Sequence, residues 1–193
     1  MSTFYTIGHS TRPLAVFAEL LLGAEIELVA DVRAVPRSRT NPQYNQDTLP
    51  KALETLHIGY RHFAALGGLR SKAHDVPAST NAFWRNASFR NYADYALSEA
   101  FHDGFEELRH AGANQRCAIM CAETLWWRCH RRIIADYLLN AGEAVFHILG
   151  PGHVETASLT PAARPAQTTV IYPADTPDLF DLTANRREDE EKD

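Results

Sequence analysis

The chain has 193 residues, and its composition, 45% hydrophobic and 22% charged, is that of one globular domain. Three cysteines cannot make a disulfide framework, and no apolar run approaches the roughly 20 residues that cross a bilayer. The formal net charge of −5 excludes a chain that is basic throughout. We therefore expect a cytoplasmic protein with no membrane partner. These features leave the oligomeric state open.

The first third of the chain alternates three short apolar segments with two amphipathic ones. Strands are predicted over Phe4–Gly8, Glu27–Val32 and Ile58–Phe63. Helices are predicted over residues 13–23 and 47–57. Pro13 suits a first helical turn because its missing N–H has no partner there, and Asp47 is expected to cap the second helix.

A long, basic and glycine-containing connection follows the third strand, from Ala64 to about Ser88. Connections of this length inside a compact domain are usually functional or disordered. Three regular elements are predicted after it: a helix over Phe89–His110, a strand over Cys117–Cys121 and a helix over Trp126–Asn140. Gly142 is placed to end the last of these helices.

The C-terminal part contains a fifth predicted strand, Val145–Leu149, and a possible sixth, edge strand near Thr168–Tyr172. We divide the chain into a single α/β domain (1–150), a C-terminal extension (151–185) and a charged tail (186–193). Three cations and five anions make up the whole of that tail.

Because strand and helix alternate four times, the sequence predicts an α/β fold. We expect a three-layer sandwich whose mostly parallel, five- or six-stranded sheet has helices on both faces, Rossmann-like or flavodoxin-like. In such open sheets, ligands bind beyond the carboxyl ends of the strands. The residues that follow each strand are therefore the candidate site.

Ionisable and polar side chains lie at or just after the carboxyl end of each of the first four predicted strands. They are His9 and Ser10 after the first, Asp31, Arg33, Arg37 and Arg39 after the second, Arg61 in the third, and Glu123 after the fourth. Arginine outnumbers lysine by 16 to 3, and its planar fork binds phosphate and carboxylate in a bidentate manner. We expect these arginines to bind an anionic group. For the Asp31 and Arg33 side chains, pairing with each other is the alternative.

The most specific pattern joins Glu123 to Cys129, His130 and Arg131. The last three are expected in the first turn of a helix, where free amides and the helix dipole favour anions. A cysteine in such a place has a lowered pKa and is nucleophilic, although a buried packing role is the alternative for Cys129. Cys121, inside an apolar strand, is expected to be structural.

His9 is either a general base or a hydrogen-bonded turn residue. The spacing of Cys121, Glu123, Cys129 and His130 matches no common zinc motif, so we expect no metal. There is no phosphate-binding Walker loop and no glycine-rich dinucleotide fingerprint, and no cofactor is expected.

Four motifs, in order along the chain, resemble the family called domain of unknown function 488. They are Thr6-Ile7-Gly8-His9-Ser10, Asp31-Val32-Arg33 with Pro36-Arg37-Ser38, Leu66-Gly67-Gly68, and Met120-Cys121-Ala122-Glu123 followed by Cys129-His130-Arg131. The resemblance covers about Phe4 to Leu149 and implies a bacterial-type cytosolic α/β domain. It implies no reaction. Trp126-Trp127 departs from the shorter polar spacer, such as Asp-Pro, that the family pattern leads us to expect there.

We expect an enzyme, a hydrolase or transferase, or a binding protein for an anionic, phosphate-bearing ligand such as a nucleotide or nucleic acid. In the enzyme, Glu123 or His9 acts as general acid or base while arginines neutralise phosphate. One alternative is a non-catalytic nucleic-acid-binding module, with the connection 64–88 and loop aromatics such as Trp84 as its contact surface. The other is a thiol-dependent enzyme that uses Cys129.

Overall fold

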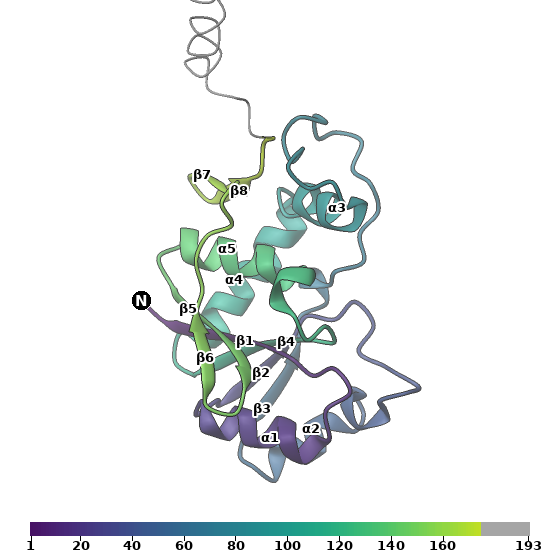
Figure 1. Ribbon diagram of the computed structural model, residues 1–193, viewed down its shortest axis with the longest axis vertical. Helices are drawn as coiled ribbons and strands as arrows, with labels where there is room; N and C mark the ends of the chain where they lie inside the picture. Colours follow the sequence, from purple (N-terminus) through teal and green to yellow (C-terminus); the bar gives the residue numbers. More distant parts are fainter. Residues whose placement is uncertain (175–193) are drawn as a thin grey trace, which may run out of the picture.

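The computed structural model describes residues 1–174, and Figure 1 shows a central sheet with helices on each side of it. Five parallel strands and one antiparallel edge strand follow the order β3-β2-β4-β1-β5-β6. The strands are β1 (Thr3–Gly8), β2 (Leu28–Asp31), β3 (Gly59–His62), β4 (Cys117–Cys121), β5 (Ala144–Gly150) and β6 (His153–Thr156). The predicted three-layer α/β fold with a mostly parallel sheet is therefore confirmed.

The helices divide between the two faces of the sheet, and the strand residues alternate between them. The helices are α1 (Leu14–Gly23), α2 (Leu49–Glu54), α3 (Ala87–Tyr95), α4 (Glu99–Gly112) and α5 (Arg131–Asn140). Phe17 of α1 and Leu49 of α2 pack in one buried cluster with Ile7 of β1. Phe101 of α4 and Ile133 of α5 pack in the other cluster, and both clusters exclude water almost completely.

The order of the strands opens a crevice at the carboxyl end of β4. β4 lies between β1 and β2, which lead to α1 and α2 on one face, whereas β4 itself leads to α5 on the opposite face. Loops that leave neighbouring strands in opposite directions separate from each other, and ligand sites of open α/β sheets lie at such points. From the strand order we therefore expect a ligand site at the segment after Cys121.

The single long helix predicted over Phe89–His110 was wrong, because the structure divides it into α3 and α4. Ser98 caps the second helix: its hydroxyl accepts a hydrogen bond from the Phe101 N–H at 3.3 Å. Asn86 caps α3 in the same way, through the N–H groups of Ser88 and Phe89. A serine oxygen competes for backbone N–H groups, so it favours a helix start over a helix interior.

The helix predicted from Trp126 was wrong at its N-terminal end. Trp126–Arg128 forms a short 3₁₀ helix, η3, Cys129 is extended, and α5 begins only at Arg131. Asp47 is not a helix cap either, because α2 begins after Thr48 and no side chain caps it. Asp47 instead pairs with exposed Arg37.

The edge strand predicted near Thr168–Tyr172 is β8 (Thr169–Ile171), which does not join the main sheet. It pairs with β7 (Arg164–Ala166) in a separate two-stranded sheet beside α5. The sequence did not indicate β6, whose four residues are all exposed. The predicted tail 186–193 lies outside the described residues. Within residues 1–174, no helix is long and apolar enough to span a membrane.

Candidate functional site

Two neighbouring cavities open at the carboxyl ends of β1, β2 and β4. The first, here called the thiol cavity, has a volume of about 370 Å³ and is lined by both Cys121 and Cys129. The second, the hydroxyl cavity, has a volume of about 300 Å³ and is lined by Ser10 and Arg37. Arg33 and Glu123 belong to the walls of both, so the two cavities are neighbours, and together they are here called the crevice.

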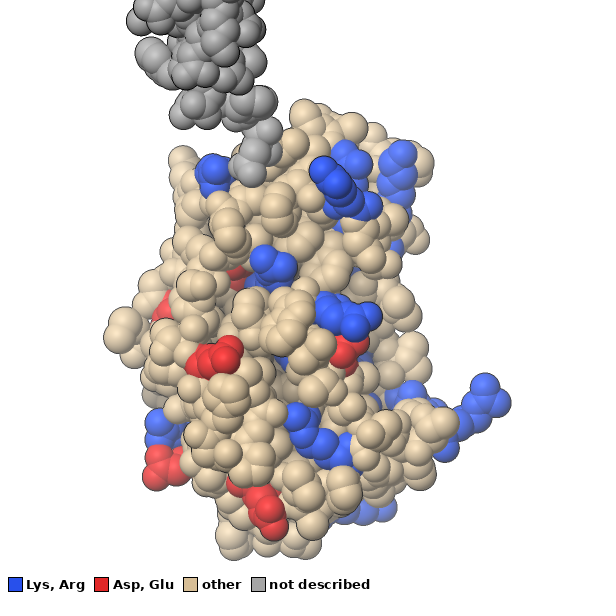
Figure 2. Space-filling model, viewed as in Figure 1, with Lys and Arg blue, Asp and Glu red and all other residues tan. Residues whose placement is uncertain are grey.

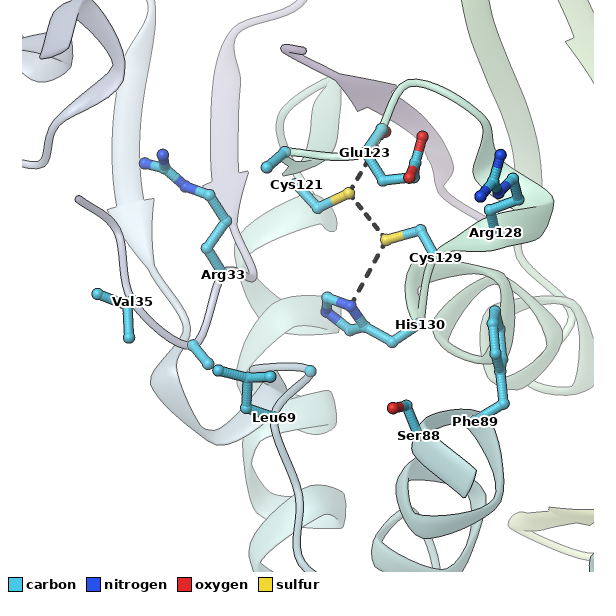
Figure 3. A pocket seen from close by; sticks show the side chains of 13 residues that line it. Arg33, Val35, Leu69, Ser88, Phe89, Cys121, Glu123, Arg128, Cys129 and His130 are labelled. Carbon is cyan, nitrogen blue, oxygen red and sulfur yellow. Dashed lines mark hydrogen bonds between the residues drawn. The ribbon is translucent and has the colours of Figure 1, made fainter. Parts of the chain in front are cut away.

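Two thiols and an imidazole stand in a row along the thiol cavity (Figure 3). Cys121 is the last residue of β4, and Cys129 and His130 immediately precede α5. The sulfur atoms of Cys121 and Cys129 are 2.8 Å apart, and Cys129 Sγ is 3.5 Å from Nδ1 of His130. The turn between β4 and α5 brings these groups together because η3 and the extended Cys129 reverse the chain.

The hydrogen bonds of His130 set which ring nitrogen carries its proton. Nε2 lies 2.9 Å from the carbonyl oxygen of Val32, so it must donate and the proton is on Nε2. Nδ1 is then an acceptor that faces the Cys129 thiol. Burial lowers the pKa of His130, which keeps the ring neutral. A Cβ on Gly68 would lie 2.5 Å from Nδ1, so glycine allows the loop to cover the ring.

Arg131 places a positive charge beneath the two thiols. Its side chain is 1% exposed; Nη1 contacts Cys121 Sγ, and Nη2 donates to the Thr124 carbonyl at 2.8 Å. Nη1 also donates to the Glu123 carbonyl, so the guanidinium holds the turn that carries the site. Among residues 1–174, no carboxylate forms an ion pair with Arg131. A buried cation needs an anionic partner, and a thiolate of this cluster can supply it.

The same contacts set the acidity of the thiols. Burial raises the pKa of Cys129, but the hydrogen bond with Cys121 and the positive charge and N–H groups of Arg131 outweigh it and lower the pKa to about 7. Burial and the neighbouring Cys129 raise the pKa of Cys121 well above its ordinary value. One proton is therefore lost from the pair near neutral pH, and the sulfur that faces His130 carries the charge.

Asp31, Arg33 and His9 form a buried network between the two cavities. Arg33 Nη2 is 2.6 Å from the carboxylate of Asp31, which is 0% exposed, so these two charges neutralise each other. Nη1 of Arg33 donates to Nε2 of His9 at 3.2 Å, and Nδ1 of His9 donates to the Ser10 carbonyl at 2.8 Å. Both nitrogens of His9 are occupied. Of the two readings of His9, this geometry favours the hydrogen-bonded turn residue over the general base.

The remaining predicted site residues lie in different surroundings. Arg37 is exposed and pairs with Asp47 at 3.4 Å while lining the hydroxyl cavity. Arg39 is exposed and lines neither cavity, and Arg61 pairs with Glu107 of α4 and also lines neither cavity. Glu123 stands on the rim with its carboxylate accepting from the Leu125 N–H at 3.3 Å. Arg61 and Arg39 are thus not brought to the crevice.

Several residues of the thiol cavity were missed in the sequence. They are Ala34, Val35, Leu69, Ser88, Phe89 and Arg128. Val35 is 61% exposed and Leu69 79% exposed, so the cavity has an apolar rim (Figure 3). Cys121, expected to be structural, lines the cavity beside Cys129. The Leu66-Gly67-Gly68 motif was the one sequence signal for this wall of the cavity. Position 67 requires glycine because a Cβ there would lie 2.8 Å from Ala34 Cα, and this close approach brings the loop against the residues after β2.

The loop aromatics differ in exposure: Trp127 is 43% exposed, whereas two others are buried. Tyr44 is fully buried and stacks on the His9 ring, and Trp84 is 7% exposed. Trp126 stacks on His147 with 4.2 Å between ring centroids. Basic side chains are spread along one face, from the region of α3 to the loop before α2, rather than gathered in one patch (Figure 2).

Within residues 1–174, no three or more histidine, cysteine, aspartate or glutamate side chains are grouped to hold a metal ion.

Comparison with known proteins gives one family: the model described as "Domain of unknown function DUF488" matches residues 13–138. This match is shorter than the expected Phe4–Leu149, so the Thr6–Ser10 motif lies outside it. No curated protein and no solved structure matches the chain.

Proposed function

The chain belongs to the DUF488 family, whose name assigns no reaction, and from that premise we propose that it is a thiol-dependent enzyme with Cys129 as its nucleophile. The supporting observation is the 3.5 Å approach of Cys129 Sγ to the unprotonated Nδ1 of His130. A cysteine beside an oriented base, with a third group that fixes the base, is the arrangement of activated thiol nucleophiles. The Val32 carbonyl is that third group.

In the proposed chemistry, His130 Nδ1 accepts the thiol proton and Cys129 Sγ attacks an electrophilic atom of a small molecule in the thiol cavity. Arg131 stabilises the thiolate before attack, and its hydrogen bonds to the Glu123 and Thr124 carbonyls keep the turn in place. Glu123 and Arg128 stand on the rim, where they can bind charged substituents of the substrate. The free thiols suit a reducing compartment such as the cytoplasm.

Alkylation by iodoacetamide, followed by peptide mass mapping at a series of pH values, tests this proposal. We expect Cys129 to be labelled first, with a midpoint near pH 7, the value to which its pKa is lowered. His130→Gln should slow labelling at neutral pH by about tenfold, because it removes the base that accepts the thiol proton. Cys117→Ser is the matched control, because Cys117 is buried in β4 and burial raises its pKa to about 12.

Two outcomes contradict the proposal. One is that Cys129 reacts no faster than Cys117. The other is that its labelling midpoint lies at or above the ordinary value for a free cysteine, about 8.5.

The hydroxyl cavity favours a second candidate, the binding of a phosphate-bearing ligand. Ser10, Thr11 and Ser38 line it together with Arg37, and hydroxyl and guanidinium groups are common phosphate ligands. Melting temperatures with inorganic phosphate, nucleotides and short oligonucleotides test it, with Arg37→Gln as the variant. Stabilisation that this variant loses supports the candidate, and no stabilisation by any of the three overturns it. Binding of oligonucleotides alone, weakened by salt, would instead favour a nucleic-acid-binding module.

A further inference from the structure

The second thiol of the cavity has no role in a reaction that needs only one nucleophile. Cys121 Sγ is 2.8 Å from Cys129 Sγ, and both cysteines are free. We propose that Cys121 and Cys129 act together as a redox pair that reduces a small disulfide. This inference rests on the proposed function, because Cys129 is the nucleophile in both, and it adds the reaction type and the class of substrate.

The positions of the two sulfur atoms support a disulfide bond between Cys121 and Cys129. A disulfide bond is about 2.05 Å long, so the two sulfurs need to approach by less than about 1 Å to form one. Cys129 is the more exposed of the two, at 6% against 2% for Cys121, and it faces the base His130. Cys121 lies behind it in contact with Arg131. Cys129 is therefore positioned to attack the substrate and Cys121 to attack Cys129.

The first half of the reaction joins Cys129 to one half of the substrate. The Cys129 thiolate attacks one sulfur of a disulfide R–S–S–R′, and the S–S bond of the substrate breaks. The leaving group R′S⁻ takes the proton that His130 Nδ1 accepted from the Cys129 thiol, and departs as R′SH. A mixed disulfide, Cys129–S–S–R, remains in the cavity.

The second half forms the internal disulfide. The Cys121 thiol loses its proton as its sulfur attacks Cys129 Sγ, and the bond between Cys129 and the substrate breaks. RS⁻ takes that proton, by way of His130, and leaves as RSH. In sum, one disulfide and two protein thiols give two small thiols and a Cys121–Cys129 disulfide, with two electrons passing from protein to substrate. A dithiol reductant returns the protein to its starting state.

The rim of the cavity indicates what the substrate carries. The charged Glu123 and Arg128 line the cavity together with the apolar side chains of Val35, Leu69 and Phe89 (Figure 3). A zwitterionic amino-carboxylate group offers an ammonium to Glu123 and a carboxylate to Arg128. The apolar side chains fit the carbon and sulfur atoms that follow it. The geometry points to disulfides of amino-acid thiols, of which cystine is the simplest.

A single-turnover experiment with the full chain, reduced and then freed of reductant, tests the inference. Cystine is added, released thiol is measured, and peptides are mapped by mass spectrometry without reduction. We expect two thiols released per chain and a Cys121–Cys129 link. Cys121→Ser should stop at a mixed disulfide on Cys129 with one thiol released, whereas Cys117→Ser should behave as the unaltered chain does.

Charge variants test the substrate class. Arg128→Gln and Glu123→Gln should each slow the reaction with cystine by about fivefold, the effect of one exposed charge pair. They should slow the reaction with uncharged hydroxyethyl disulfide less than the reaction with cystine, because that substrate offers no charge to either side chain. Equal rates with both disulfides in both variants would overturn the zwitterionic substrate.

The failure of this inference is distinguishable from that of the proposed function. If Cys129 is alkylated near pH 7 but neither disulfide produces a Cys121–Cys129 link, the redox pair is excluded. The proposal that Cys129 is a nucleophile is then retained. If Cys129 does not react with iodoacetamide at all, both fail.

Discussion

At the scale of single residues, the site depends on which atoms face one another. His130 is a base for Cys129 only because the Val32 carbonyl holds the proton on Nε2. His9 has a similar position after β1, yet Arg33 and Ser10 occupy both of its nitrogens. The sequence offered His9 as a general base and His130 only as a ligand-binding residue. It could not identify His130 as the base, because the deciding partners lie on other strands.

Gly68→Ala tests the packing of the base. The new methyl group would lie 2.5 Å from His130 Nδ1, closer than two such atoms can approach, so the imidazole must leave the position in which Nδ1 faces Cys129. We expect alkylation of Cys129 at neutral pH to fall by about tenfold, as it does when the base is removed. Gly23→Ala is the control, since nothing lies within 4 Å of its Cβ position. Equal labelling rates in the two variants would show that the His130 ring does not need this cover.

Cys121 shows the limit of sequence patterns at this scale. Its place at the end of an apolar strand predicts a buried packing residue, and it is indeed 2% exposed. Its function-bearing contacts come from Cys129 and Arg131, eight and ten residues further along the chain. The contact depends on how the intervening turn closes, which no local pattern specifies.

At the scale of elements, strands were predicted better than helix ends. β4 was predicted with its exact bounds, because a short uninterrupted apolar run is typical of a strand that is buried on both faces of a parallel sheet. The start of α5 was placed five residues early, since Trp126 and Trp127 continue the apolar pattern although they form a 3₁₀ turn. That error put Cys129 inside a helix, whereas its extended backbone is what turns its sulfur toward Cys121.

Two substitutions test which polar residues cap helices. Ser98→Ala removes the hydroxyl that accepts from the Phe101 N–H at the start of α4, and we expect a loss of about 1 kcal/mol in the free energy of unfolding. Asp47→Ala removes only an exposed ion pair with Arg37 and should change it by no more than about 0.5 kcal/mol. Urea denaturation of both variants measures the difference. A larger loss in the free energy of unfolding for Asp47→Ala than for Ser98→Ala would show that Asp47 caps α2 after all.

At the scale of the whole molecule, the alternation of strands and helices was enough to predict the layers and the edge at which the site lies. The residues after β1, β2 and β4 do meet there, because those three strands are neighbours. Arg61 does not, although it also lies near a strand end. Successive strand residues point to opposite faces, and Arg61 pairs with Glu107 of α4 on the face of the sheet rather than at its edge.

Two buried histidines, His9 and His147, should make the fold sensitive to acid. Each is 2% exposed, and burial lowers the pKa of each from 6.5 to about 4. Between those values the unfolded chain binds protons that the folded chain does not, so stability is complete above pH 6.5 and falls toward pH 4. We expect a loss of about 1.4 kcal/mol per pH unit for each histidine.

Urea denaturation across this pH range measures the slope, and His147→Gln should reduce the slope while His9 and His130, whose pKa values are also lowered, keep part of it. Its side-chain amide can retain a hydrogen bond with Thr6, the present partner of His147 Nδ1 at 2.8 Å. A free energy of unfolding that does not change between these pH values would mean that the two rings are charged in the folded protein.

The thiolate of low pKa that we propose for Cys129, at the end of β4, can be titrated directly through its absorbance. The unaltered chain should gain one thiolate per molecule with a midpoint near pH 7, and Cys129→Ser should lose that step. A first thiolate that forms only at or above about pH 8.5, the ordinary value, or a step near pH 7 that survives Cys129→Ser, would contradict the account.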